Sequence, residues 1–169
     1  SPFHAVAVFD RRFARDARVL KRGNPKTKGD VAPRRFLSVV SGDNPALFQT
    51  GSGRLEMARA IADPTNPLTA RVWVNRIWGH HFGAGLVRTP SDFGVRAAPP
   101  SHPELLDWLA GRLIASGWST KAIHREIVLS SAYRQSSSGP LDQAVLSKAE
   151  QSDPDNRLVW RFPPQRLSF

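Results

Sequence analysis

The side chains best suited to chemistry gather between residues 75 and 102, on and after one apolar segment. Arg76 and His80 are four apart and so lie on one side of a helix, and with Asn75 they form a polar strip there. His80 and His81 are neighbours, so their rings point about 100° apart on a helix and do not suit one shared metal ion. We therefore predict no metal site. Two alternatives stay open for these histidines: helix-end contacts or a buried imidazole, and a ligand, acid–base or haem-facing role.

Three further residues complete the candidate polar cluster. Arg88 and Asp92 lie in the turn-rich loop 83–94, and His102 lies shortly after it. Asp92 or Asp107 can supply a carboxylate to the polar strip, since buried polar side chains need partners. The cluster is interpreted either as a structural hydrogen-bond network or as a site for an anionic or hydroxyl-rich ligand, and its members are Asn75, Arg76, His80, His81, Arg88, Asp92 and His102.

Other catalytic arrangements are weak in this chain. It has no cysteine, which excludes thiolate metal ligands, a cysteine nucleophile and covalent haem attachment. Ser130, Ser131 and His124 do not form a nucleophile signature such as Gly-x-Ser-x-Gly. The loop 83–94 lacks the Gly-Lys-Ser/Thr run of a phosphate-binding loop. No reaction follows from the residue pattern alone.

Helices must position these residues, because apolar side chains recur at helical spacing from residue 52 onward. Asn66 and Pro67 are typical of a helix N-cap and first turn, and they predict a helix over 68–82 that Gly83 ends. Its apolar residues lie on most sides, as in the central helix of a bundle. Further helices are predicted from Ser52 to residue 63, from a capping box at Ser101 and Glu104 to about Gly117, from Ser119 to about residue 135, and more weakly over 140–151 and 154–161.

The N-terminal third has a different pattern. Residues 4–9 alternate around apolar side chains and predict a short strand, with residues 18–22 as its partner. Residues 23–53 are dense in Gly, Pro, Asn and Ser, with one short apolar turn at 36–40. The sequence therefore predicts a mainly α fold, a compact bundle of about four to six helices with an N-terminal β-hairpin or extended basic arm. We place the arm at 1–51 and a helical domain, truncated at its C-terminus, at 52–169.

The formal net charge is +10, and its distribution limits what it indicates. Residues 1–35 hold ten Lys and Arg against three Asp, whereas the other 134 residues carry a net charge of only +3. A basic arm can bind phosphate groups without sequence preference, or it can face an acidic neighbour as a solvated hairpin. We favour the second, which makes nucleic acid the weaker choice of partner. No stretch approaches the roughly 20 apolar residues that cross a bilayer, so no transmembrane segment is expected.

Several long motifs point together to one family. They are SGRLEMAR at 52–59, DPTNPLTARV at 63–72, VNRIWGHHFG at 74–83, GLVRTPSDFG at 85–94, PSHPELLDWL at 100–109 and DPDNRL at 153–158. In these segments the chain resembles DUF1553, a domain family of unknown function that is typical of planctomycetes and related bacteria. The resemblance covers nearly the whole chain.

The resemblance implies a context more than a mechanism. Domains of this family usually follow a partner domain of unknown function, and often a c-type cytochrome domain, in large exported proteins. This implies an accessory or structural module in the periplasm or at the cell surface, linked to electron transfer, with haem c on another domain and no cofactor in this chain. The alternatives are a hydrolase-type enzyme acting on carbohydrate or another surface polymer through the His, Arg and Asp residues above, and nucleic-acid binding through the basic arm. The family supplies no established catalytic residues.

Overall fold

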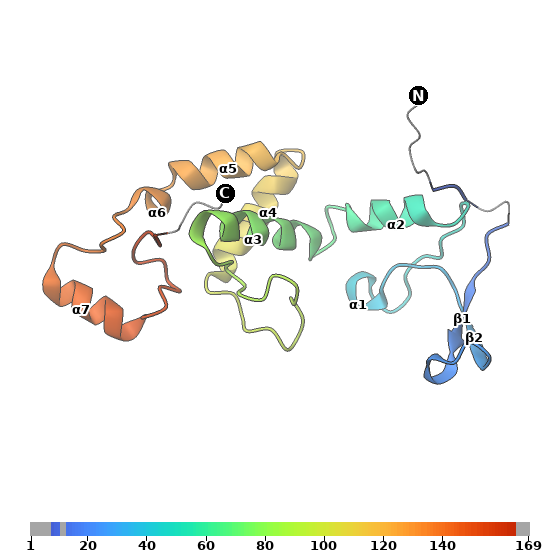
Figure 1. Cartoon of the computed structure of the whole chain (residues 1–169). Coiled ribbons are helices and arrows are strands. Elements are labelled where there is room, and N and C mark those ends of the chain that lie inside the picture. The colour runs from blue at the N-terminus through green and yellow to red at the C-terminus, as the bar shows by residue number, and fades with distance from the viewer. Residues whose placement is uncertain (1–7, 11–12, 165–169) are drawn as a thin grey trace, which may run out of the picture. The chain divides into compact units, whose positions relative to one another are not determined.

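The computed structural model describes residues 8–10 and 13–164 (Figure 1). The chain divides into two compact units, Ser1–Asn66 and Pro67–Phe169, each of which is described by itself. Most of the strand predicted at 4–9 lies outside the described residues, and Val8 and Phe9 are not in a strand.

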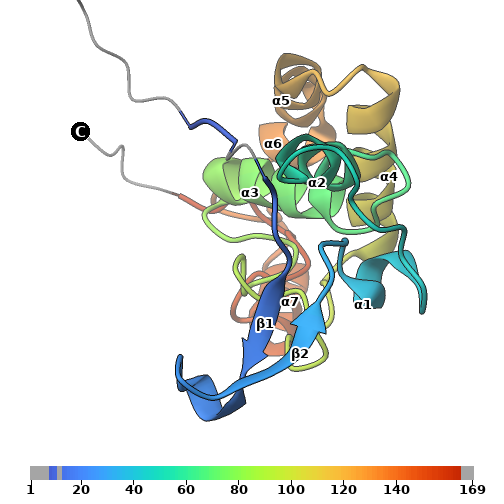
Figure 2. The same cartoon turned by 90° about the vertical axis from the view of Figure 1, so that its right-hand side faces the viewer.

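The first unit contains a β-hairpin. Strand β1 (Ala17–Leu20) pairs antiparallel with β2 (Lys28–Ala32), with Arg18 opposite Val31 (Figure 2). The short 3-10 helix η1 (Lys21–Gly23) reverses the chain between them, and the Lys21 N–H donates to the Thr27 carbonyl at 3.0 Å. The predicted strand at 18–22 is therefore confirmed in type and pairs with β2, while the partner predicted for it at 4–9 lies mostly outside the described residues. The chain turns back directly after β1, so the following segment pairs with it.

Two helices complete the first unit. Helix α1 (Ser38–Ser41) overlaps the predicted apolar turn at 36–40, and α2 (Arg54–Ile61) lies within the predicted first long helix. The predicted N-cap at Ser52 is wrong, because Gly53 takes that place at φ 83°. A Cβ at Gly53 would lie 2.8 Å from the Cβ of Phe48, so the backbone passes too close to Phe48 for a larger residue.

Asn66 has a different role from the predicted one. Its side-chain amide donates to the Ala60 carbonyl at 3.1 Å and so satisfies the C-terminal end of α2. Helix α3 (Thr69–Phe82) instead begins after Leu68, which makes no side-chain cap. The prediction of Asn66 as the N-cap of α3 is therefore wrong, because Leu68 occupies the N-cap position.

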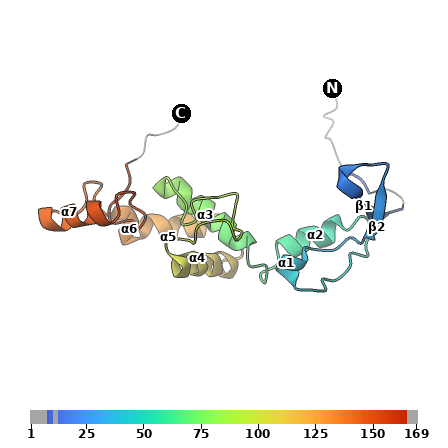
Figure 3. The ribbon, with the colours of Figure 1, turned by 90° about the horizontal axis from the view of Figure 1, so that it is seen from below.

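Three helices form the core of the second unit. Helix α3 packs against α4 (Pro103–Ala115) and α5 (Thr120–Leu129), and Figure 3 shows these three helices gathered together, with α7 set apart from them. The most deeply buried side chains come from all three helices and from the loop after α3, and include Val74, Leu86, Leu109, Leu113 and Ile123. Helix α3 is therefore central, as its nearly continuous apolar surface predicted.

The helix ends around this core follow local chemistry. Gly83 ends α3 at φ 78°, and Gly117 follows α4 at φ 66°, both as predicted. Ser119 caps α5 by accepting the Ala122 N–H at 3.3 Å, which confirms the predicted cap. The predicted capping box at Ser101 is wrong, since its Oγ lies 3.0 Å from His102 Nδ1 and His102 occupies the cap position.

The last part of the chain departs most from prediction. The helix expected to reach about residue 135 breaks at Ser130, whose Oγ accepts the Tyr133 N–H and starts α6 (Ser131–Arg134). Helix α7 (Gln143–Ser152) confirms the weak helix predicted over 140–151. The short helix predicted over 154–161 is wrong.

Left-handed backbone explains that error. Asn156 and Val159 have φ of 51° and 56°, which a right-handed helix does not allow. The mainly α fold with an N-terminal hairpin is confirmed. Within the described residues, no helix is both long and apolar enough to span a bilayer.

Candidate functional site

Asn75 fixes the loop that follows α3. Its side chain is 1% exposed, and its amide donates to the Val87 carbonyl at 3.0 Å while its oxygen accepts the Val87 N–H at 2.9 Å. These two hydrogen bonds join helix α3 to the loop as two bonds join paired strands, and they satisfy both the oxygen and the N–H group of the amide. Asn75 therefore holds the backbone next to Arg88 in one place.

Gly85 allows that close approach. A Cβ added there would lie 2.6 Å from Asn75 Nδ2 and 2.6 Å from the Val87 carbonyl oxygen. No real side chain tolerates such distances, so glycine is needed for contact rather than for backbone freedom. Asn75 and Gly85 together set the position of the loop 83–94.

Four of the predicted residues do not meet. Arg76 and His80 are exposed on α3, and neither makes a hydrogen bond or ion pair within the part of the chain that the structure describes. The Asp92 carboxylate accepts the N–H of Gly94 at 2.9 Å, inside its own turn. His102 contacts its neighbour Ser101. The strip of Arg76 and His80 thus gains no carboxylate partner from the described residues.

His81 does find a partner. Its Nε2 lies 2.7 Å from Nδ1 of His124 on α5, and the two rings meet edge to face with centroids 4.9 Å apart. Burial lowers the pKa of His81 below its ordinary value of 6.5, and positive charge on His124 and His80 lowers it further. One ring must donate and the other accept, so the pair shares a single proton between its facing nitrogens. Double protonation is disfavoured.

Aromatic rings surround the histidine pair. The ring of Tyr133 on α6 lies edge-on to His81 with centroids 5.5 Å apart, and it also contacts Phe162 at 5.1 Å. Phe82 stacks on Trp78 with centroids 4.1 Å apart. The sequence did not predict the roles of His124 and Tyr133, because their distances along the chain from His81 carry no periodic signal.

A small cavity opens on the other side of Phe82. Its volume is about 100 Å³, and it lies between the loop after α3 and the segment after α7. Arg88 spans these two segments, since its Nη2 donates to the Asp155 carbonyl at 3.0 Å. Arg157 lines the same cavity. Of the predicted residues, Arg88 lines this cavity.

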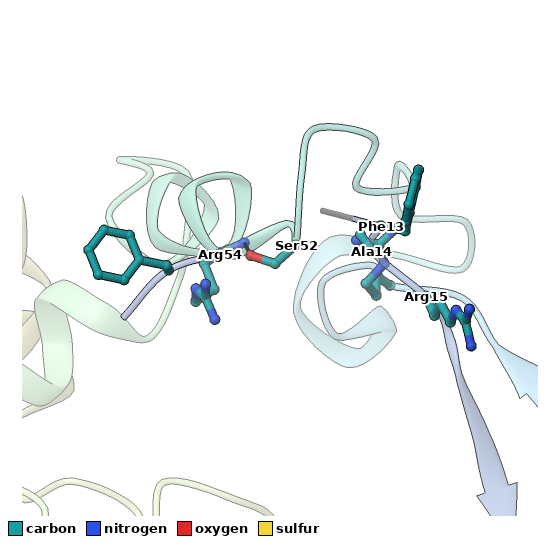
Figure 4. Close-up of a pocket in the computed structure, with 7 residues that line it drawn as sticks. Phe13, Ala14, Arg15, Ser52 and Arg54 are labelled. Carbon is teal, nitrogen blue, oxygen red and sulfur yellow. Dashed lines mark hydrogen bonds between the residues drawn. The ribbon is translucent and has the colours of Figure 1, made fainter. Parts of the chain in front are cut away.

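A larger hollow of about 590 Å³ lies in the first unit. Three of its lining side chains, Phe13, Arg15 and Arg54, point in different directions instead of converging (Figure 4). Two of its arginines are neutralised by ion pairs, Arg34 with Asp16 at 2.7 Å and Arg54 with Asp10. We interpret this hollow as open surface without a concentrated binding chemistry.

Metal ligation has no geometric support among the described residues. They contain no group of three or more His, Cys, Asp or Glu side chains placed to hold a metal ion. The facing nitrogens of His81 and His124 already occupy hydrogen-bond distance, so an ion between them would have to push the rings apart.

The fold and the comparisons with known proteins assign the chain to a family. This is a mainly α chain with an N-terminal hairpin, in which the Asn75 side chain holds the loop after α3. The chain belongs to the family PSD1, described as a protein of unknown function (DUF1553), whose model matches residues 53–169. Comparison with curated proteins and with solved structures found no match.

Proposed function

We propose that the chain is an accessory, non-catalytic module that docks onto other domains of a larger exported protein. One observation carries this proposal. The described part of the unit Ser1–Asn66 fully buries none of its large apolar side chains and leaves twelve of them exposed, whereas the buried hydrophobic core of the described residues lies between Ala70 and Ile127.

The exposed side chains are numerous and substantial. In the first unit they are at least 41% exposed, and Val39 and Phe9 reach 88% and 83%. The set is Val8, Phe9, Phe13, Val19, Leu20, Val31, Leu37, Val39, Leu47, Leu55, Met57 and Ile61. Covering apolar surface contributes about 25 cal/mol per Å², so a unit whose described residues bury no large apolar side chain gains stability by docking. Scattered exposed residues alone would be ordinary, but here they replace a core.

The setting follows from the family resemblance. Such domains usually accompany a partner domain and often a c-type cytochrome domain, which favours the periplasm or cell surface and a link to electron transfer. Haem c would then be attached elsewhere on the polypeptide, because covalent attachment needs cysteines and this chain has none.

The geometry gives the enzyme and nucleic-acid alternatives less support. Hydrolysis needs an acid, a base or a nucleophile that converge on one point, and no hydrogen bond or ion pair joins the described side chains of Arg76, His80 and Asp92. In the first unit, two arginines already pair with aspartates, which reduces the positive face available to phosphate groups.

Hydrogen–deuterium exchange tests the docking proposal. The 169-residue chain and a longer native polypeptide that contains it are compared, amide by amide. We expect residues 13–66 to exchange more slowly in the longer protein, while the core helices α3, α4 and α5 keep the same protection. Equal exchange of residues 13–66 in both proteins would contradict docking.

A pair of matched variants sharpens the test. The double change Leu37→Ser and Val39→Ser removes two exposed apolar side chains from the first unit, and Leu141→Ser removes one that is 104% exposed in the second unit. We expect only the double variant to lose the added protection in the longer protein. Equal loss in both variants would show that the effect is a general one of apolar surface.

A further inference from the structure

Two guanidinium groups that line the cavity beside Phe82 form no ion pair within the described residues. Four arginines in the described residues form ion pairs with Asp or Glu, and neither Arg88 nor Arg157 is among them. The Arg88 guanidinium reaches a backbone carbonyl, and the Arg157 side chain makes no hydrogen bond within the described residues. Guanidinium groups on one small cavity attract an oxyanion, which they can bind in a forked geometry.

The segment 155–159 forms one lip of the cavity, and hydrogen bonds hold its backbone in place. The buried Asp153 carboxylate accepts the backbone N–H groups of Arg157 at 2.8 Å and Leu158 at 2.7 Å. The side chain of Asn156 bonds both the N–H and the carbonyl of Arg161. The turn therefore holds Arg157 through its backbone and leaves its side chain available.

Strain in this lip points to a binding role. Asn156 and Val159 both line the cavity, and both have left-handed φ values, of 51° and 56°. A β-branched residue in this region is an outlier, and such outliers persist where the surroundings hold them, often at ligand sites. Gln135 supplies part of that hold by donating to the Val159 carbonyl at 2.8 Å.

Size and lining define the ligand. A volume of about 100 Å³ holds roughly three waters at about 30 Å³ each, or one small organic group. One wall is the stacked pair Trp78 and Phe82, and Ser101 adds a polar atom at the rim. Asp155 also lines the cavity, so its charge together with the two guanidinium groups favours a monoanion over a phosphate dianion.

We infer that this cavity binds a carboxylate that bears a short apolar chain, with Arg88 and Arg157 holding the carboxylate and the Trp78–Phe82 wall contacting the chain. Such a group comes either from a free short-chain carboxylic acid or from a glutamate side chain of another protein segment. The inference concerns the second unit alone and does not depend on docking by the first.

NMR titration of the isotope-labelled 169-residue chain tests the inference. Propionate is the probe, and propionamide is the neutral control of the same shape. We expect saturable shifts of the Trp78 indole N–H and of backbone amides at 85–88 and 155–159 with propionate, and binding of propionamide weaker by about tenfold. Equal binding of the two probes, or no shift at about 100 mM propionate, overturns the inference.

Variants separate the site from general charge. Arg157→Gln keeps the backbone bond to Asp153 and is expected to weaken propionate binding about tenfold, with an otherwise unchanged spectrum. Arg125→Gln removes the same charge from an exposed position on α5 outside the cavity and should leave binding unchanged. Equal weakening by both variants overturns the inference.

A second probe identifies the source of the carboxylate. A short peptide with blocked ends and a single glutamate is titrated under the same conditions. Tighter binding of this peptide than of propionate at the same amides assigns the cavity to a protein segment. Tighter binding of propionate assigns it to a free acid. If Arg157→Gln loses its dispersed spectrum, Arg88→Gln takes its place with the same expectation.

Discussion

The contact between Gly85 and Asn75 gives a prediction whose size follows from the structure. In Gly85→Ala, the new Cβ would lie 2.6 Å from Asn75 Nδ2, 2.7 Å from Asn75 Oδ1 and 2.6 Å from the Val87 carbonyl oxygen. Ordinary contact begins near 3.4 Å, so all three atoms overlap the added methyl group. Because Val87 is itself buried, the Asn75 amide must move and break its two hydrogen bonds.

The expected loss in the free energy of unfolding is the sum of several small contributions. Each of the two hydrogen bonds contributes about 1 kcal/mol net, and a buried N–H or carbonyl left without a partner costs about 1–3 kcal/mol. Partial relaxation of the loop reduces the second cost. We therefore expect Gly85→Ala to lower the free energy of unfolding by about 2–4 kcal/mol, a large part of what holds a domain together.

Gly79→Ala is the matched control from the same interface. The nearest atom to a Cβ at Gly79 is the Gly85 nitrogen at 3.4 Å, which is ordinary contact. Alanine in a helix interior is better than glycine by about 1 kcal/mol, so this variant should be neutral or more stable. Urea unfolding followed by tryptophan fluorescence measures both. A Gly85→Ala variant within about 0.5 kcal/mol of the parent chain, or equal effects of the two variants, would refute the reasoning.

Three further predictions concern charge and caps. Because the pKa of His81 is lowered in the folded chain, the unfolded chain binds the proton more readily, and the free energy of unfolding should fall as pH drops below 6.5. An NMR titration should place the midpoint of His81 under that value. The change His124→Phe removes one cause of the lowered pKa and should move this midpoint upward. The hydrogen bond from Arg71 lowers the pKa of Asp107, so the ion pair stabilises the folded chain above pH 3.8 and loses this effect as pH falls below that value. Since both groups are partly exposed, Asp107→Asn should lower the free energy of unfolding by less than about 1 kcal/mol. The measurement is the dependence of thermal stability on pH below 3.8, which should be flatter in the variant. Asp153→Ala leaves two backbone N–H groups without their acceptor and should cost about 1–3 kcal/mol in urea unfolding, and a cost near zero would show that water replaces the carboxylate.

Local patterns predicted the elements that local chemistry decides. Gly83 and Gly117 end helices because glycine adopts positive φ freely, and Ser119 caps α5 because its hydroxyl reaches an N–H three residues on. The apolar surface of the helix at 69–82 indicated its central place, and the structure buries Val74 and Ile77 there. These features depend on residues a few positions apart.

Predictions failed at three places where the structure gives a polar side chain or a backbone segment another position or partner than the pattern indicated. Asn66 was expected to cap α3, but Leu68 takes the N-cap position, and the Asn66 amide donates to the Ala60 carbonyl in α2. Ser101 was expected to cap α4, but its hydroxyl lies against His102. The residues 154–161 were expected to be helical, but the Asp153 carboxylate accepts the backbone N–H groups that a helix would use. Each of these outcomes depends on geometry that a pattern of residue types does not contain.

The residues of the candidate polar cluster do not stay together in the fold. Asn75 was grouped with Arg76 and His80 by spacing, yet the fold buries Asn75 against Val87 and leaves the other two in solvent. Adjacent positions on a helix point about 100° apart, so a strip of neighbouring polar residues is split whenever a loop packs on one side. His81 met His124 through the packing of α3 on α5, which no sequence spacing could predict.

Different hydrogen bonds hold the two lips of the small cavity. Asn75 and Gly85 hold the lip that carries Arg88, while Asp153 holds the lip that carries Arg157. Since the guanidinium groups are positioned before any ligand arrives, binding needs little ordering of the protein and gains affinity for that reason. Loosening either lip should therefore weaken binding even where both arginines remain, so Gly85→Ala should reduce propionate affinity while Gly79→Ala leaves it unchanged.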